Sequence, residues 1–409
     1  MTADLRLVAI GFYTPGTGLT RVMDSILRRL TGCWEIHYLG IGYAGEIVRD
    51  RGLTIYPTNR KGGDVFAAFE ARRLIEEIHP RVVLILHDIW MFDHYLRVLG
   101  PLRAPLRIVA YIPLDGLIVN QKAAAPLRQA DRVVVYTEYA RREFENAFRG
   151  LGGEGFPAVE VIPHAVDRDR FFPYAELIAA SFDPVGRAAA KRRLLPDLPD
   201  IESSFIVLNP NRPDRRKRID LTLAGFAQFA AGKPDNVRLC LHQAFMGELE
   251  MEQIPALVGR LGLDSRVHLN PLGRGVRDDG ELNLLYNACD VGINTSMGEG
   301  WGLTSMEHGA AGGAQIVPDH TACAELWRGR CELIPVARRY VPDFSVLEMG
   351  EVSPEGVAGA LENLYCNRER RRELSRAAFA MTGNPAWSWD RIAGQFDELF
   401  RGLARAQRA

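Results

Sequence analysis

The sequence has 409 residues, of which 47% are hydrophobic and 25% are charged, and its formal net charge is −1. This length predicts two or three domains. The near-zero charge excludes a global field that would draw the chain to nucleic acid or to an anionic membrane. The chain shows neither a signal peptide nor a window of ~20 apolar residues, and its cysteines form no CxxC pairs. We therefore expect a cytoplasmic protein with reduced thiols, while peripheral membrane contact and the oligomeric state stay open.

The first half of the chain alternates short apolar runs with longer amphipathic stretches, of which Val65–Ile78 is an example. Four runs are apolar without alternation, which is typical of strands buried on both faces of a parallel sheet. These runs are Leu5–Ile10, Val82–Leu86, Arg107–Ile112 and Arg132–Tyr136. This alternation of strands and helices predicts a doubly wound parallel α/β sheet.

The pattern breaks in residues 171–200, a proline-rich stretch that we interpret as the crossover into a second domain. Five further strand candidates follow it: Phe205–Leu208, Val237–Leu241, Val267–Leu269, Val291–Asn294 and Gln315–Val317. Residues 357–405 are mostly helical in pattern. Ligands of open α/β sheets bind beyond the carboxyl ends of the strands, so the loops after these strands are the places to search for a site.

The strongest motif is a glycine-rich loop that follows the strand candidate Val291–Asn294 and leads into a predicted helix. Its glycines leave the backbone free to approach a ligand closely, and they are Gly298, Gly300 and Gly302. The helix start offers free N–H groups as an anion site, those of Leu303, Thr304 and Ser305. Glu299 and Glu307 flank this cradle and could accept hydrogen bonds from ligand hydroxyl groups. On spacing alone, a solvated Glu299 and a dipole-stabilising Glu307 explain the motif equally well.

A second motif places five cations in seven residues directly after a buried strand: Arg212, Arg215, Arg216, Lys217 and Arg218. Cations at the end of a strand could neutralise a diphosphate without a metal, although a solvated basic loop is the alternative. A weaker signal is the turn with Gly16 and Gly18 after the first strand, which does not match the dinucleotide fingerprint GxGxxG.

The run from Asp290 to Gly312 resembles glycosyltransferase family 4, retaining enzymes of the GT-B fold with two glutamates separated by seven residues. The resemblance implies that Glu299 contacts the donor sugar and Glu307 the ribose. It also implies a diphosphate site formed by the amides of Leu303 and Thr304, with Gly300, Trp301 and Gly302 as further donor-binding residues. Arg212 and Lys217 match the family's Arg and Lys five residues apart, which leaves Arg215, Arg216 and Arg218 as expected surface residues. Gly16 and Gly18 match a loop that reaches the donor phosphates.

The sequence also departs from the family pattern. His164 and Ala165 stand where the family usually has Asn-Gly, and no histidine follows the run Arg107–Ile112, where many members have a sugar-contacting one. Asp115 could take over a polar role there. His87 and Asp88 follow another strand candidate, and we interpret them as acceptor-side residues rather than metal ligands. We treat the DxD triplet Asp167–Asp169 as coincidence.

These observations predict a GT-B enzyme with two Rossmann-like domains facing a central cleft. Residues 1–185 form the expected acceptor domain, residues 200–385 the nucleotide-sugar domain, and residues 386–409 a helix that returns to the first domain. The expected activity is metal-independent, retaining transfer of a sugar, a hexose by expectation, from a nucleoside-diphosphate sugar to a glycan, lipid or small molecule. No cofactor or metal is expected, and the base, sugar and acceptor stay undetermined. The alternatives are a catalytically silent nucleotide-sugar-binding protein and a sugar-nucleotide epimerase.

Overall fold

The computed structural model describes residues 5–59, 62–102, 106–243 and 248–405, and the chain divides into two compact units. The first unit comprises residues 1–165, 342–347 and 386–409, and the second comprises residues 166–341 and 348–385. Residues 166–185 thus belong to the second unit, whereas the sequence placed them in the first domain. The reason is hydrogen bonding to distant residues of the second unit, because the backbone N–H groups of Phe172 and Tyr174 donate to the side chains of Asn283 and Asn287.

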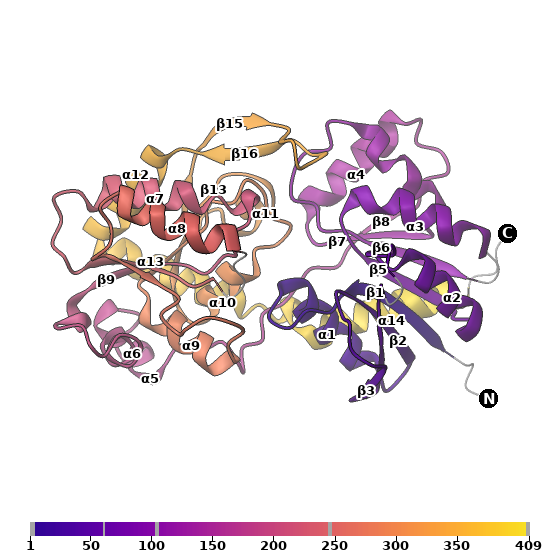
Figure 1. Cartoon of the computed structure of the whole chain (residues 1–409), viewed down its shortest axis with the longest axis horizontal. Helices are drawn as coiled ribbons and strands as arrows, with labels where there is room; N and C mark the ends of the chain where they lie inside the picture. Colours follow the sequence, from indigo (N-terminus) through magenta and orange to yellow (C-terminus); the bar gives the residue numbers. More distant parts are fainter. Residues whose placement is uncertain (1–4, 60–61, 103–105, 244–247, 406–409) are drawn as a thin grey trace. The chain divides into compact units, whose positions relative to one another are not determined.

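The first unit is built on an eight-stranded sheet of order β3-β4-β2-β1-β5-β6-β7-β8, parallel except for the β3–β4 pair. Its strands are β1 (Arg6–Phe12), β2 (Glu35–Ile41), β3 (Val48–Asp50), β4 (Leu53–Pro57), β5 (Val82–Leu86), β6 (Arg107–Tyr111), β7 (Arg132–Val135) and β8 (Val159–Val161). Its helices are α1 (Gly18–Leu30), α2 (Ala68–Ile78), α3 (Phe92–Leu99), α4 (Glu138–Gly150) and α14 (Trp389–Arg405). The last helix packs against α1 (Figure 1), and Trp34 Nε1 donates to Asp397 Oδ1 at 2.7 Å.

The second unit is built on a six-stranded parallel sheet of order β11-β10-β9-β12-β13-β14 and carries a separate antiparallel β15–β16 pair. Its strands are β9 (Phe205–Asn209), β10 (Val237–Leu241), β11 (Val267–Leu269), β12 (Val291–Ile293), β13 (Ala314–Pro318), β14 (Glu332–Ile334), β15 (Val336–Tyr340) and β16 (Met349–Val352). Its helices are α5 (Ala175–Ala179), α6 (Ala188–Leu194), α7 (Ile219–Ala230), α8 (Glu248–Arg260), α9 (Asp279–Ala288), α10 (Leu303–Ala310), α11 (Thr321–Trp327), α12 (Pro354–Cys366) and α13 (Arg368–Thr382).

Strand β9 shows why this sheet is covered on both faces. All five of its residues are buried, and successive side chains of a strand point to opposite faces. Phe205 and Val207 join the core under α7, α8 and α12, whereas Ile206 and Leu208 join the core under α6 and α9. Figure 1 shows the helices on the two sides of this sheet. The predicted doubly wound parallel architecture is therefore confirmed.

The strand order also locates the point where a ligand is expected in the second unit. Strand β9 pairs with β10 on one side and with β12 on the other, so the order of the chain reverses between β9 and β12. Loops that leave such a switch point diverge, and ligands of open α/β sheets bind at the carboxyl ends of these strands. None of the described helices is both long and apolar enough to span a bilayer.

Candidate active site

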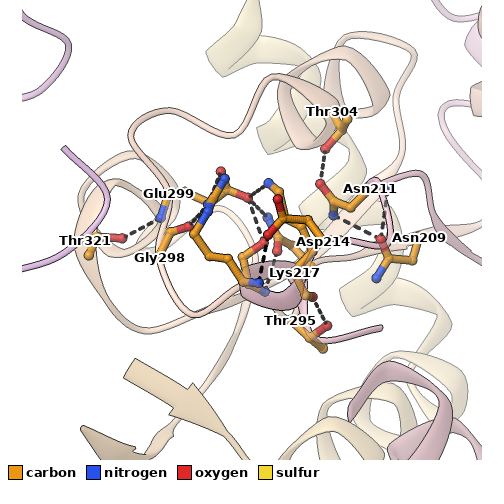
Figure 2. A network of polar contacts seen from close by, with 12 residues as sticks. Asn209, Asn211, Asp214, Lys217, Thr295, Gly298, Glu299, Thr304 and Thr321 are labelled. Atoms are coloured by element: carbon orange, nitrogen blue, oxygen red, sulfur yellow. Dashed lines mark hydrogen bonds and ion pairs between the residues drawn. The ribbon is translucent and has the colours of Figure 1, made fainter. Parts of the chain in front are cut away.

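A buried carboxylate lies at the centre of the switch point in the second unit. Glu299, on the loop after β12, is 5% exposed, and its Oε1 accepts three hydrogen bonds. The donors are Lys217 Nζ at 2.5 Å, Asn294 Nδ2 at 3.0 Å and Ser296 Oγ at 2.8 Å. Figure 2 shows Lys217 reaching Glu299 from the neighbouring loop, the one that follows β9. The site therefore joins a cation and a carboxylate from the two loops that flank the switch point.

A second cation adds to this charge cluster. Arg216 Nη1 lies 3.5 Å from Glu299 Oε2 and also donates to the carbonyl oxygen of Gly298. The sequence predicts Arg216 to be a surface residue, and this prediction is wrong, because its side chain is only 20% exposed and turns into the site. Arg218, also expected on the surface, pairs with the buried Glu351 and with Asp220.

The charges of this cluster set the protonation state of Glu299. Burial by itself raises the pKa of a carboxyl group. The opposing effects of the Lys217 and Arg216 cations, with hydrogen bonds from Lys217 and Asn294, hold the pKa of Glu299 well below its ordinary value. Glu299 is therefore an ionised acceptor at neutral pH.

The loop after β9 is folded so that Lys217 points inward. Asp214 accepts a hydrogen bond from the backbone N–H of Arg216 at 2.8 Å, and its carbonyl oxygen accepts one from Lys217 N at 2.8 Å. Arg218 then adopts a left-handed conformation, with φ of 48°, directly before α7 begins. Thr295 Oγ1 donates to the carbonyl oxygens of Lys217 and Arg218 at 3.1 and 2.9 Å. The hydroxyl group of Thr295 thus joins the two loops, and Figure 2 labels this residue beside Lys217.

The start of α10 forms the next part of the site. Gly302 precedes the helix with φ of +87°, a left-handed conformation that favours glycine, and offers no side-chain cap. The first N–H groups of an α-helix have no carbonyl partner within the helix, so this end is suited to an anion. Thr304 Oγ1 contacts Asn211 Oδ1 at 3.3 Å, which connects α10 to the loop after β9 (Figure 2). The helix starts at Leu303, as the sequence predicts.

The second glutamate of the motif lies in the same helix. Glu307 is 6% exposed, and its Oε2 accepts a hydrogen bond from the hydroxyl group of Tyr286 at 2.8 Å. Tyr286 belongs to α9, so this bond fixes Glu307 across two helices. Sequence reasoning did not single out Tyr286, Asn294 or Ser296. The signal for the last two was their place at the end of a buried strand.

The other predicted donor residues are arranged differently. Arg212 is exposed on the loop after β9, Gly300 is half-buried and Trp301 is buried. Gly16 and Gly18 belong to the first unit, where Gly16 has φ of +80° in the turn between β1 and α1. The structure therefore brings Lys217, Glu299 and the start of α10 together in the second unit. Gly16 and Gly18 belong to the first unit.

The predicted acceptor-side residues also belong to the first unit. His87, at the end of β5, is buried among aromatic rings, with the centroids of Phe12 and Phe66 each 5.3 Å from its own. Burial lowers the pKa of His87 to about 4, so the ring is neutral. Asp88 and Asp115 are half-buried. Within the described residues, no group of three or more His, Cys, Asp or Glu side chains is placed to hold a metal ion.

The fold defined by these two units is that of the GT-B glycosyltransferases. Sucrose-phosphate synthase from Thermosynechococcus elongatus matches with a TM-score of 0.73 and 18% identity, over 98% of this chain and 100% of that chain. HepE from Anabaena, solved in complex with UDP and glucose, matches with a TM-score of 0.69 and 14% identity, over 97% of this chain and 100% of that one. At these identities the likeness concerns the fold.

The sequence of this chain is similar to that of mannosylfructose-phosphate synthase from Agrobacterium fabrum. The two sequences are 27% identical over 166 residues, which are 40% of this chain and 33% of that protein. The match thus spans about a third of the length of this relative. No family model matches the chain.

Proposed function

We propose that this protein is a retaining, metal-independent glycosyltransferase that moves a sugar from a nucleoside-diphosphate sugar to an acceptor hydroxyl group. The observation that carries the proposal is the buried Lys217–Glu299 pair, which lies at the switch point beside the uncapped start of α10. The likeness to HepE, whose structure holds UDP and glucose, supports a nucleotide sugar as the donor. The names of the similar synthases do not identify the substrates of this chain. The acceptor is therefore a glycan, a lipid or a small molecule.

In the proposed reaction, the bond between the anomeric carbon and the phosphate oxygen breaks, and a bond from that carbon to the acceptor oxygen forms. Negative charge develops on the departing diphosphate, where Arg212, Arg216 and Lys217 can neutralise it together with the N–H groups at the start of α10. Donors fixed in advance around a developing charge are commonly the largest contribution to catalysis. The family resemblance supports retention, with a phosphate oxygen of the leaving group taking the proton of the acceptor on the same face.

The two glutamates would orient the donor. Binding of a diphosphate gives Lys217 a second anionic partner, which frees lone pairs of Glu299 to accept hydrogen bonds from sugar hydroxyl groups. Glu307, fixed by Tyr286, would accept hydrogen bonds from the ribose. Because both carboxylates are buried and held by neighbouring donors, little reorganisation is needed when the donor binds.

The test is release of free nucleoside diphosphate from UDP-, GDP- and ADP-hexoses, with EDTA present and with a panel of acceptors. Glu299→Gln should lower turnover of the accepted donor by about 10²–10³-fold, as expected for loss of one such group. Glu373→Gln, which changes an exposed residue of α13, is the matched control and should keep wild-type turnover. The anomeric configuration of the product, read by NMR, tests retention.

Three outcomes would count against the proposal. Equal turnover in Glu299→Gln and wild type would remove Glu299 from the reaction. Isomerised nucleotide sugar without any acceptor would identify an epimerase. Binding of a nucleotide sugar without release of diphosphate from any donor would identify a silent binding protein, the alternative favoured by the absence of a histidine after β6.

A further inference from the structure

A cavity of the second unit lies at the amino ends of the strands of this sheet, opposite the candidate active site. Its volume is about 310 Å³, and its wall includes Ser204 and Phe205 at the start of β9, Asp290 just before β12, and Arg368 and Arg371 from α13. Strand β9 has five residues and spans roughly 13–17 Å at ~3.3 Å per residue. The cavity is therefore separated from Glu299 by the length of the strand.

Most of the charges around this cavity are already paired. Lys191 Nζ lies 2.8 Å from Asp290 Oδ2 and also donates to the carbonyl oxygen of Ser204 at 2.6 Å. On the rim, Glu202 pairs with Arg192 at 2.8 Å, and Arg368 forms a two-bond pair with Asp183. These three pairs cancel, so the remaining charge of the wall is the guanidinium group of Arg371.

Arg371 is a buried cation that the charges of Asp290 and Asp183 reach only from beyond ion-pair distance. It is 9% exposed, and its Nη1 donates to the carbonyl oxygen of Leu364 at 2.6 Å. Its Nε has no hydrogen-bond partner, and no ion pair involves this residue within the described part of the chain. The guanidinium carbon lies 5.1 Å from the centre of the Phe205 ring. A buried charge is costly unless an opposite charge or sufficient hydrogen bonds compensate it.

A second unsatisfied donor lies in the same wall. Ser204 is 3% exposed, and its hydroxyl group finds no partner among the residues that the structure describes. Buried polar groups are rarely left without a hydrogen bond, so each exception calls for an explanation. Here the two exceptions share one cavity, and both are donors. A single anion in the cavity would satisfy both and would neutralise Arg371.

We propose that this cavity binds a small phosphate-bearing anion, held by Arg371 and Ser204. The planar guanidinium group suits the tetrahedral oxygens of a phosphate because it can donate two parallel hydrogen bonds. The hydroxyl group of Ser204 can donate a further one. The anion is either free phosphate or the phosphate group of a sugar phosphate, which present the same chemistry to these two residues. This site is separate from the donor site and does not depend on the proposed transferase activity.

The experiment is a titration of the full chain with inorganic phosphate and with a hexose 6-phosphate, followed by thermal shift and calorimetry. Both probes should raise the Tm of the wild type in a saturable way. Arg371→Met, which removes the charge but keeps a long side chain, should weaken binding at least tenfold, as expected for lost hydrogen bonds to a charged group. Arg370→Gln removes the preceding charge of the same helix and is the matched control, with wild-type binding.

Two further variants keep the test decisive. Ser204→Ala should also weaken binding, and it serves if Arg371→Met fails to fold. Arg376→Gln changes an exposed cation of α13 that belongs to neither proposed site, and it should leave the response unchanged. A response that persists in both Arg371→Met and Ser204→Ala, or that disappears in Arg376→Gln, would overturn the proposal, as would the absence of saturable binding. Equal affinity for the two probes would identify free phosphate as sufficient, and tighter binding of the hexose 6-phosphate would identify an ester.

Discussion

At the scale of single residues, the charge of the candidate site is concentrated in a pair that water hardly reaches. Lys217 is 9% exposed and Glu299 is 5% exposed. Each compensates the burial of the other, and Arg216, Asn294 and Ser296 supply the remaining contacts. A solvated loop glutamate, the alternative that the sequence left open, is therefore excluded for Glu299. Glu307 is likewise buried and accepts a hydrogen bond from Tyr286, and these contacts do not decide between a ligand-binding role and the helix-dipole role that the sequence left open.

This pairing predicts strong coupling between two substitutions. Lys217→Met and Glu299→Gln should each lower the free energy of unfolding by roughly 3–5 kcal/mol, because each leaves the other partner buried without its nearest counter-charge. The double variant should lose less than the sum of the two, since no uncompensated member of the pair remains. Urea denaturation of the four proteins measures the cycle. Arg212→Gln, an exposed cation of the same loop, should stay within about 0.5 kcal/mol of the wild type; additive losses would contradict a coupled pair.

The sequence predicted Lys217 and Glu299 but not Arg216. Within a run of five cations, composition alone does not tell which side chain turns inward. The decision lies in the backbone, where Asp214 binds the N–H group of Arg216 and Arg218 takes a left-handed conformation. Neither feature leaves a recognisable pattern in the sequence. Lys217 was selected among these cations only because Arg212 and Lys217 match the Arg and Lys that lie five residues apart in glycosyltransferase family 4.

At the scale of elements, the buried strands of both sheets were the most predictable features. The ranges Val82–Leu86 and Val237–Leu241 were predicted as they are found, because the first is buried throughout and the second at every residue except Arg238. The edge strand β3 reads Val-Arg-Asp and is exposed, so no hydrophobic signal marks it. The start of α10 was predictable because a glycine-rich loop precedes it. Strand signals therefore come from burial, and they weaken toward the edges of a sheet.

The left-handed glycine before α10 gives a test at this scale. Gly302→Ala should lower the free energy of unfolding by roughly 1–2 kcal/mol, because a side chain at positive φ is strained. It should also weaken donor binding by shifting the first turn of the helix. Gly359→Ala lies in the exposed face of α12 with open space around its Cα, and there alanine should stabilise by roughly 0.5–1 kcal/mol. Equal effects of the two variants in urea denaturation would remove the special role of Gly302.

At the scale of the whole molecule, the chain forms two α/β units whose boundary follows Ala165. The sequence located a crossover only as a proline-rich stretch, residues 171–200. Hydrogen bonds to distant residues decide to which unit such a segment belongs. Those from Phe172 and Tyr174 to α9 are examples. Bonds of this kind link positions more than a hundred residues apart and leave no local pattern. The class of fold was therefore predictable, whereas the boundary was not.

Buried neutral histidines predict how the stability of the molecule depends on pH. Burial lowers the pKa of seven histidines: that of His87, His242, His268 and His320 to about 4, that of His164 and His308 to about 3, and that of His37 below its ordinary value. Their pKa in the unfolded chain is about 6.5. Below that pH the unfolded chain takes up protons that the folded chain does not. Stability should therefore fall as the pH decreases from about 6.5 to 4, by up to roughly 1.4 kcal/mol per histidine and pH unit.

Urea unfolding at several pH values between 7.5 and 4.5 measures this dependence. His87→Phe, which fills an aromatic surrounding with a ring that binds no proton, should reduce the slope by about one proton. A stability that stays level or rises between pH 6.5 and 5 would show that the histidines are not buried in the neutral form.

We propose that a nucleoside diphosphate binds at the Lys217–Glu299 site and the start of α10. The most direct measurement is a thermal-shift panel of UDP, GDP and ADP with and without EDTA, on the wild type, Glu307→Ala and the surface control Glu373→Ala. One nucleotide should stabilise the wild type and the control, by roughly 2.7 kcal/mol at a hundredfold excess over its Kd, independently of EDTA and less in Glu307→Ala. No shift with any nucleotide, or an equal shift in Glu307→Ala, would contradict the assignment of this site.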